Sequence, residues 1–221
     1  DGALAEYVKS PARIIHKIAS YIQPIEAQSV TSIATALRGI KRSNLKVGQS
    51  VVIQGPGYSG LNLAQLAKIS GASPVIVTGT RDTRLELAKQ VGADVVVNVN
   101  ETNWQNKILE ATNGRGPDVV IEATGRPDAI PQAIDMVKMG GTILVFSVTN
   151  GVVRELQAVK LYQKDISLIG NKGGYFEYGN AIEFLESGII KEREMVSHTF
   201  SLCVTPQAFD FAINNKSEVM R

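Results

Sequence analysis

The stretch that decides the fold is Ser50-Val51-Val52-Ile53-Gln54-Gly55-Pro56-Gly57-Tyr58-Ser59-Gly60-Leu61. Its first five residues are strand-like, and the glycines that follow match the pattern G-x-G-x-x-G. From Leu61 to Ser70, small and apolar residues recur at helical spacing, which predicts a helix. The glycine pattern is weak evidence by itself, but a strand directly before it and a helix directly after it indicate a dinucleotide-binding turn.

Each glycine of this turn has a physical role in binding a dinucleotide. Gly55 permits the tight turn, Gly57 lets the backbone approach a pyrophosphate, and Gly60 lets the helix pack close against the strand. The pyrophosphate then lies on the unpaired N–H groups at the positive end of the helix. The predicted cofactor-binding residues of this turn are Gly55, Gly57, Tyr58, Ser59, Gly60 and Leu61.

The end of the second strand indicates which dinucleotide binds. A site for NAD(H) usually has Asp or Glu about 20 residues after the turn, to hold the ribose 2′-hydroxyl. This chain has Gly79 at that position, followed by Thr80, Arg81 and Arg84. A hydroxyl and two cations suit a 2′-phosphate, so the sequence favours NADP(H) over NAD(H). Asp82 leaves the alternative open, since a carboxylate turned inward would serve the ribose of NAD(H).

Two further strand ends are predicted to border the same crevice. Thr124 follows the fourth apolar run, and Ser147 and Val148 follow the fifth. These positions are small and polar enough to border an adenine or a nicotinamide. Plain strand-ending turns would explain them equally well.

Strand-like and helical segments alternate from Ser50 onward. Several of the strands are continuous apolar runs, which is the pattern of strands buried on both faces. This alternation predicts repeated right-handed βαβ units and therefore an α/β fold, a doubly wound parallel sheet of the Rossmann type. The strands are expected at 50–54, 75–78, 95–99, 119–123, 142–146 and 166–169, and the helices at 61–70, 84–91, 104–112, 129–139 and 157–162.

The two ends of the chain depart from this alternation. The pattern predicts a strand at 4–8 and a helix at 25–41 before the sheet, and a strand at 196–202 and a helix at 206–214 after it. We therefore expect residues 1–42 and 189–221 to be remnants of a second domain that flank a dinucleotide-binding domain at 43–188. The absence of an initiator Met agrees with an excised or processed piece.

Composition excludes several classes of function. With 23 Lys and Arg against 21 Asp and Glu, the net charge is +2, so we expect neither nucleic acid nor an anionic membrane as a partner. No apolar run approaches the roughly 20 residues that span a bilayer, and the N-terminus is neither a signal nor a transit peptide. The single Cys203 fits a reducing compartment, so we expect the cytoplasm. His16 and His198 lack partners at metal spacing, and no metal ligand or catalytic residue is assigned.

Together these residues resemble the medium-chain dehydrogenase/reductase superfamily, in particular its zinc-type alcohol, polyol and threonine dehydrogenases. The similar segments run through most of the chain and are far more specific than the glycines alone. They comprise Ala5–Val8 with His16–Ile18, Ala34–Leu37, Leu45–Ile53, Gly55–Leu61, Arg84–Lys89, Gly92–Asp94, Asp118–Gly125 and Gly140-Gly141.

The resemblance implies a two-domain enzyme that moves a hydride between an alcohol or carbonyl and NAD(P). An N-terminal GroES-like barrel would carry a catalytic zinc that polarises the substrate oxygen, and the cofactor domain would orient the nicotinamide. Since nearly all of that barrel is missing here, zinc is expected only in a full-length parent, and this chain alone should oxidise no alcohol. Relatives often join cofactor-domain sheets edge to edge, so the resemblance also implies a homo-oligomer.

One position departs from the family pattern and keeps alternatives open. Thr31 stands where many relatives place Glu or Cys before the connecting helix, and Thr is a poor zinc ligand. The same fold would then serve a zinc-free quinone or enoyl reductase. A non-catalytic NADP(H)-binding module is the other alternative. The substrate stays unassigned, although residues 171–175 are candidates for its pocket.

Overall fold

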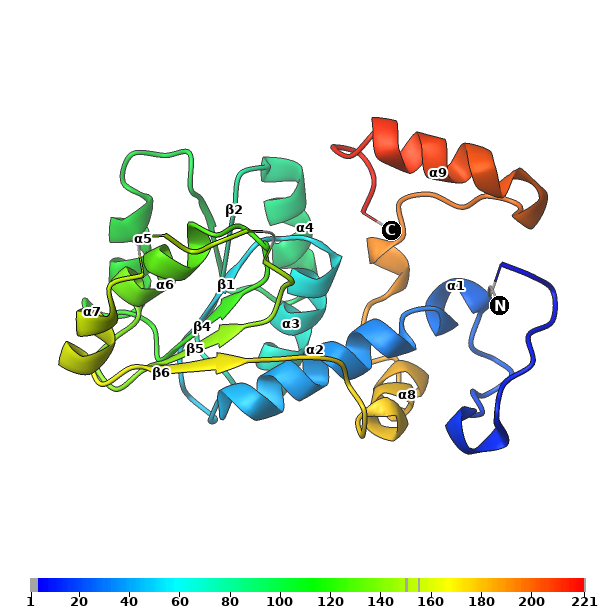
Figure 1. Cartoon of the computed structure of the whole chain (residues 1–221), viewed down its shortest axis with the longest axis horizontal. Coiled ribbons are helices and arrows are strands. Elements are labelled where there is room, and N and C mark those ends of the chain that lie inside the picture. Colours follow the sequence, from blue (N-terminus) through cyan, green and yellow to red (C-terminus); the bar gives the residue numbers. More distant parts are fainter. Residues whose placement is uncertain (1–3, 150, 155, 221) are drawn as a thin grey trace.

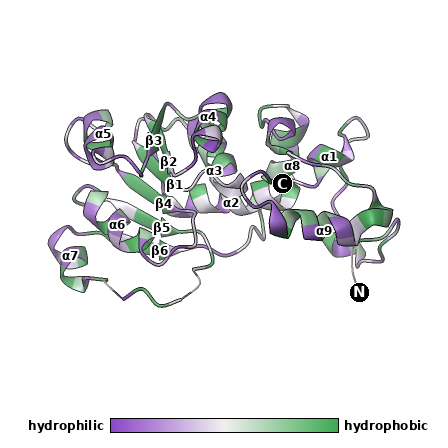
Figure 2. Cartoon of the chain, turned by 90° about the horizontal axis from the view of Figure 1, so that it is seen from above, coloured by the Kyte–Doolittle hydropathy of each residue, from purple (hydrophilic) through white to green (hydrophobic). Residues whose placement is uncertain are grey.

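The computed structural model describes residues 4–149, 151–154 and 156–220. Within these residues, six strands form one parallel sheet in the order β3-β2-β1-β4-β5-β6 (Figure 1 and Figure 2). The order reverses between β1 and β4, which confirms the predicted α/β, doubly wound parallel sheet. The strands are β1 (Val51–Gln54), β2 (Val75–Gly79), β3 (Val95–Asn98), β4 (Val119–Glu122), β5 (Thr142–Val145) and β6 (Ser167–Gly170).

Helices cover both faces of this sheet, and each face has its own apolar core. Val51 and Ile53 pack with α2, α3, α4 and α8, whereas Val52 and Ile76 pack with α5 and α6 (Figure 2). This follows from the strand geometry, because successive side chains point to opposite faces. The helices are α1 (Pro24–Ala27), α2 (Val30–Ser43), α3 (Tyr58–Ile69), α4 (Asp82–Val91), α5 (Trp104–Ala111), α6 (Ala129–Met136), α7 (Ala158–Gln163), α8 (Tyr178–Glu186) and α9 (Thr205–Asn214).

The two strands predicted near the ends of the chain are wrong. Residues 4–8 form no ladder and precede the short 3-10 helix η1 (Ala12–Ile14). Residues 196–201 connect η2 (Arg193–Met195) to η3 (Leu202–Val204) without strand pairing. An apolar pattern makes a strand only where a neighbour supplies hydrogen bonds, and the described part of the chain supplies none to these segments. The helix predicted at 25–41 is also two helices, α1 and α2.

The N-terminal segment instead packs through side chains on α8, a helix that the sequence reading missed. The His16 ring stacks on Tyr178 with 5.2 Å between ring centroids. The N–H of Ala19 donates to Glu186 Oε1 at 2.8 Å. His16 is therefore a packing residue, as its sequence context suggested.

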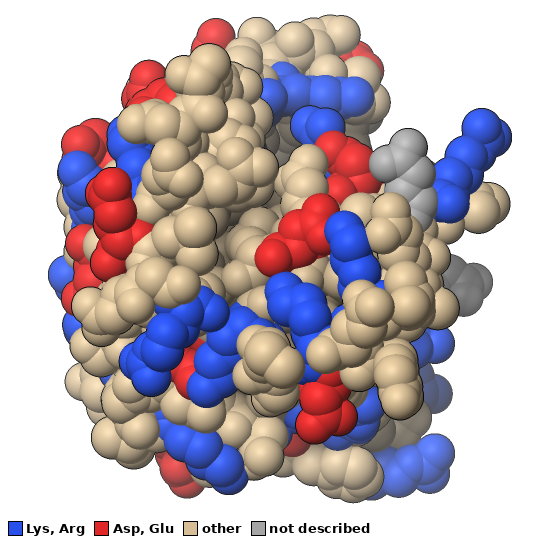
Figure 3. Space-filling view, turned by 90° about the vertical axis from the view of Figure 1, so that its left-hand side faces the viewer, with Lys and Arg blue, Asp and Glu red and all other residues tan. Residues whose placement is uncertain are grey.

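The surface carries mixed charge, and no described helix is a candidate membrane span. Lys and Arg as well as Asp and Glu side chains lie on the side that carries α5, α6 and α7, separated by uncharged surface (Figure 3). None of the helices in the described residues combines the length and apolar character that crossing a bilayer requires.

Asp118 ties the start of β4 to the start of β1. Its Oδ2 accepts hydrogen bonds from the Ser50 N–H at 2.8 Å and the Ser50 hydroxyl at 2.6 Å, and Lys138 forms an ion pair with Oδ1. Partial burial alone would raise the pKa of the Asp118 carboxyl. The hydrogen bonds from Lys138 and Ser50 outweigh that effect, and the pKa lies below its ordinary value.

We expect Asp118→Asn to lower the free energy of unfolding at pH 7 by about 1–3 kcal/mol, the usual cost of losing charged hydrogen bonds. The pKa of the Asp118 carboxyl is lower in the folded state than in the unfolded state, where it is about 3.9. The negative charge therefore stabilises the fold fully at pH values above about 3.9, and this stabilisation is lost as the pH falls through the folded-state pKa. Urea unfolding at pH 7 and near pH 3 measures the difference. A cost that is equal at both pH values would contradict this account. The exposed Asp135→Asn, whose partner is Lys160, is the control and should change little.

Candidate functional site

A cavity of about 460 Å³ opens at the carboxyl ends of β1, β2 and β4, and we call it the switch-point cavity. Ligands of open α/β sheets bind at this point, where the strand order reverses. The lining residues come from the ends of β1, β2, β3 and β4, from the glycine turn, and from the starts of α4, α5 and α6. They are Gln54, Gly55, Pro56, Gly57, Thr78, Gly79, Thr80, Arg81, Arg84, Val99, Asn100, Trp104, Ala123, Thr124, Arg126, Asp128, Ala129 and Gln132.

The glycine turn forms the wall beside β1. Gly55 has φ +104°, a conformation that favours glycine, and its N–H donates to Thr78 O at 2.8 Å. A Cβ at Gly60 would lie 1.9 Å from the carbonyl oxygen of Gly55, so no side chain fits there. A Cβ at Gly57 would meet no atom within 4 Å. The fold itself therefore needs Gly55 and Gly60, whereas Gly57 keeps space open beside the N-terminus of α3.

The buried Glu122 shapes the opposite wall at the end of β4. Its Oε1 accepts hydrogen bonds from the Thr124 N–H at 2.6 Å, the Thr124 hydroxyl at 2.7 Å and the Gly125 N–H at 2.7 Å. These three bonds fix the turn that carries Thr124 to the cavity. Glu122 is fully buried at 0% exposure and does not line the cavity, so it positions the wall from within the fold.

The end of β2 has no side chain where an acidic residue would stand. A Cβ on Gly79 would lie 2.5 Å from Cγ and 2.6 Å from Cδ of Pro56. The proline ring of the glycine turn thus occupies the space in which any side chain at position 79 would begin. Pro56 and Gly79 together leave this corner of the cavity without a carboxylate.

Two arginines beside that corner are held by the carbonyls of a distant segment. Arg81 Nη1 donates to Lys216 O at 3.3 Å, and Arg84 Nη2 donates to Lys216 O at 3.2 Å and to Val219 O at 2.9 Å. Partial burial and the nearby charge of Arg81 lower the pKa of Arg84, although an arginine stays protonated near neutral pH. Since these acceptors are neutral, both positive charges remain available to an anion.

Asp82 points its carboxylate elsewhere. Its Oδ1 accepts a hydrogen bond from Asn98 Nδ2 at 2.7 Å, and Asp82 does not line the cavity. The alternative in which Asp82 holds a ribose hydroxyl gains no support from this arrangement.

Residues 60–187 match the family model for zinc-binding dehydrogenases, which is more than half of the chain. This chain belongs to the zinc-binding dehydrogenase family. The match begins at Gly60 of the glycine turn and runs through β6 and α8. The resemblance seen in the sequence is thereby confirmed.

Relatives of this zinc-binding dehydrogenase chain include a sorbitol dehydrogenase and an L-threonine 3-dehydrogenase. The chain is 30% identical to the sorbitol dehydrogenase of Bacillus subtilis strain 168, over 100% of this chain and 63% of the relative. It is 32% identical to the L-threonine 3-dehydrogenase of Pyrococcus horikoshii, over 90% of this chain and 58% of the relative. A crystal structure from Sinorhizobium meliloti 1021, described as a zinc-binding dehydrogenase bound to NADP, superposes with a TM-score of 0.89 at 29% identity, covering 94% of this chain and 62% of that one. The chain spans less than two thirds of the length of these relatives.

Several residues predicted for the site lie outside the cavity of this dehydrogenase chain. Tyr58 is half-buried and its hydroxyl donates to Glu192 Oε2 at 2.5 Å, so its side chain turns toward the segment after α8. Leu61 is fully buried in the core, and Val148 is 86% exposed beyond β5. The predicted residues that line the cavity are Gly55, Gly57, Gly79, Thr80, Arg81, Arg84 and Thr124, and those that do not are Tyr58, Ser59, Gly60, Leu61, Ser147 and Val148.

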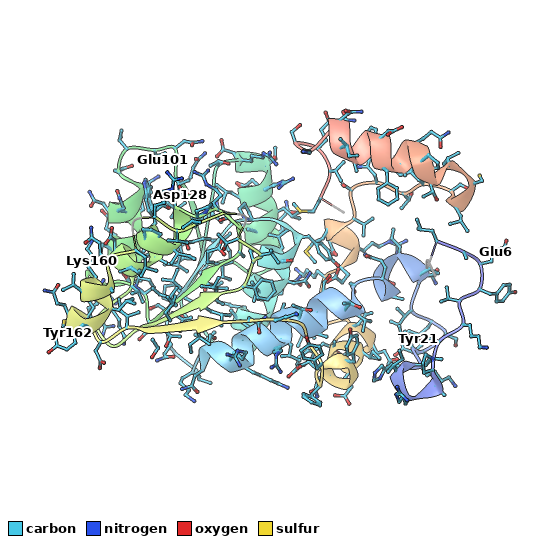
Figure 4. All side chains as sticks on the ribbon, viewed as in Figure 1. Glu6, Tyr21, Glu101, Asp128, Lys160 and Tyr162 are labelled. Atoms are coloured by element: carbon cyan, nitrogen blue, oxygen red, sulfur yellow. The ribbon has the colours of Figure 1, made fainter. Side chains whose placement is uncertain are left out.

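The sequence reading missed a charged pair at the rim of the cavity. Arg126 Nε and Nη2 donate to the two carboxylate oxygens of Asp128, at 3.0 and 2.8 Å, and Asp128 is labelled in Figure 4. The hydrogen bonds raise the pKa of Arg126 and lower the pKa of Asp128. The charged residues Arg126 and Asp128, directly after Gly125, were the signal available for this pair. Trp104 also lines the cavity while it packs against the core.

The described residues do not fit a zinc ion. Thr31 lies exposed near the start of α2, and its carbonyl accepts a hydrogen bond from the Thr35 hydroxyl at 2.8 Å. Among the described residues no three His, Cys, Asp or Glu side chains gather to hold a metal ion.

Proposed function

We propose that this chain binds NADP(H) in the switch-point cavity. Further, we propose that it is the cofactor-binding part of an oxidoreductase that transfers a hydride between a small alcohol or carbonyl and the nicotinamide. One observation carries the proposal. Arg81 and Arg84 line the cavity next to Gly79, and position 79, where NAD(H) sites usually have a carboxylate, has no side chain. The sorbitol dehydrogenase relative supports a polyol or similar alcohol as the substrate of the whole protein.

The phosphate groups of the cofactor have matching groups in this chain. The space at Gly57 admits the pyrophosphate to the N-terminus of α3, where backbone N–H groups and the helix dipole favour a negative charge. Arg81, Arg84 and the Thr80 hydroxyl would hold the 2′-phosphate, and Thr124 would border the nucleotide from the β4 side. The bound nicotinamide supplies the hydride chemistry, and the protein orients it.

The organisation of the whole protein is part of the proposal. Residues 43–188 form the cofactor domain, with 1–42 and 189–221 as segments of a neighbouring domain. The edge strand β6 is largely exposed, with Leu168 at 38%, which supports a homo-oligomer formed through this edge. The free, exposed thiol of Cys203 supports a reducing compartment such as the cytoplasm.

Parallel titration with NADPH and NADH tests the proposal, with nicotinamide fluorescence as the readout. We expect wild-type protein to bind NADPH at least about tenfold more tightly than NADH, a difference of about 1.4 kcal/mol. Arg81→Ala should remove most of that preference by weakening NADPH alone, because a charged hydrogen bond contributes about 1.5–3 kcal/mol.

The matched control for this titration is Arg115→Ala, which removes an exposed arginine that does not line the cavity. It should leave both affinities unchanged. Equal or tighter binding of NADH by the wild type would overturn the choice of NADP(H). A chain that is folded by circular dichroism and binds neither cofactor would overturn the whole proposal.

A further inference from the structure

A second cavity, of about 360 Å³, lies at the carboxyl end of β6, and we call it the β6 cavity. In Figure 1, α2 and β6 run side by side along this edge of the sheet, and a hydrogen bond between them confirms the contact. The cavity is lined by Arg38, Arg42, Gly170, Asn171, Lys172 and Tyr175. Half of these residues are cationic and none is acidic. No part of the proposed NADP(H) site uses them.

Neutral groups hold the two arginines in place without cancelling their charge. Arg42 Nε donates to the carbonyl oxygen of Gly170 at 2.8 Å. The Arg38 guanidinium lies over the Tyr175 ring, 5.6 Å from its centroid, and Arg38 Nε is buried with no acceptor among the described residues. A π face and a carbonyl orient a guanidinium and leave its full positive charge.

The acidic residue on the same loop does not neutralise this cluster. Glu177 is buried, its Oε2 accepts the Phe176 N–H, and its Oε1 lies 3.8 Å from Lys41, which does not line the cavity. Three like charges around one cavity repel each other, so a bound anion would stabilise the arrangement. Planar guanidinium groups and an ammonium group together match the oxygens of a phosphoryl group.

We propose that the β6 cavity binds the phosphoryl group of a small molecule, either free phosphate or a phosphate ester. The site is separate from the switch-point cavity, because β4 and β5 stand between β1 and β6 in the sheet. Three strand spacings amount to about 14 Å. A phosphoryl group bound at the end of β6 is thus distinct from a pyrophosphate bound at the end of β1.

Isothermal titration calorimetry at constant ionic strength tests this site. The chain is first saturated with NADPH, to occupy the switch-point cavity, and then titrated with inorganic phosphate in one arm and glycerol 3-phosphate in the other. We expect binding by the wild type and affinity at least about tenfold weaker in Arg42→Gln/Lys172→Gln, which removes two of the charges. Lys46→Gln is the control, since the Lys46 side chain is exposed, its ammonium group donates to Asn44, and it lies outside both cavities.

The two arms also identify the source of the phosphoryl group. Tighter binding of glycerol 3-phosphate assigns an ester, and equal or weaker binding assigns free phosphate. If the double variant fails to fold, Lys172→Gln alone, on an exposed loop residue, should weaken phosphate binding several-fold. The proposal fails if neither probe binds, or if the variants bind as tightly as the wild type. It also fails if the double variant changes only the oligomeric state in sedimentation, because the cavity would then be a contact with a second copy.

Discussion

Replacing Gly57 by alanine is expected to weaken NADPH binding about a hundredfold while the fold stays intact. The φ of Gly57 is −79°, which alanine adopts without strain, and its Cβ would meet no protein atom within 4 Å. The added methyl group would instead stand where the pyrophosphate approaches the backbone. A hundredfold loss is about 2.7 kcal/mol, equivalent to one or two charged hydrogen bonds. Fluorescence titration measures the affinity, and urea unfolding measures the stability.

Gly60→Ala is the matched substitution with the opposite outcome. Its Cβ would lie 1.9 Å from the Gly55 carbonyl oxygen, so the turn and α3 must move apart. We expect the free energy of unfolding to fall by about 3 kcal/mol or more, beyond the usual range for overpacking. If Gly57→Ala binds NADPH like the wild type, the pyrophosphate does not lie on this turn, and this part of the proposed function is overturned.

Gly79→Asp alone is expected to abolish tight binding of both cofactors, whereas Gly79→Asp combined with Pro56→Ala should bind NADH in preference to NADPH. The single substitution drives a Cβ to within 2.6 Å of the Pro56 ring, and the ring is rigid, so the glycine turn must shift. Removing the ring makes space for a carboxylate that can hold a ribose 2′-hydroxyl and repel a 2′-phosphate. We expect the double variant to bind NADPH at least about a hundredfold more weakly than the wild type.

A double-mutant cycle on the NADH dissociation constants separates the two effects. Pro56→Ala alone is the control and should keep the preference for NADPH. The coupling between the two positions should be about 1–3 kcal/mol, as for residues in direct contact. Additive effects would show that Pro56 does not restrict position 79.

The fold could be predicted because its causes are local. Continuous apolar runs such as Val119–Ile121 mark strands buried on both faces, and helical spacing between them fixes the alternation. The glycine turn was placed correctly for the same reason, since a strand and a helix flank it directly. The strands predicted at 4–8 and 196–202 failed because a strand depends on a distant partner that no local pattern reveals.

Residues of the candidate site could be predicted only where their distance in sequence from the glycine turn determines their place. Gly79, Arg81 and Arg84 follow from their distance to the glycine turn, and all three line the switch-point cavity. The contact between Pro56 and Gly79 depends on how two strand ends lie side by side, which composition and periodicity do not encode. The hydroxyl of Tyr58 likewise finds Glu192 across 134 positions of sequence. Contacts of this kind can be seen only once the strands are assembled into the sheet.

The carbonyl oxygens of Lys216 and Val219 accept hydrogen bonds from Arg81 and Arg84, so the C-terminal segment uses donors that the proposed function assigns to the cofactor. Under the proposed function, a 2′-phosphate would take donors that now serve Lys216 and Val219, which lie 132 to 135 positions away in sequence. Binding free energies are reciprocal, so the phosphate loosens the segment by the same factor by which the segment weakens the phosphate. Under the proposed function, cofactor binding would thereby be transmitted to the C-terminal segment around Lys216 and Val219.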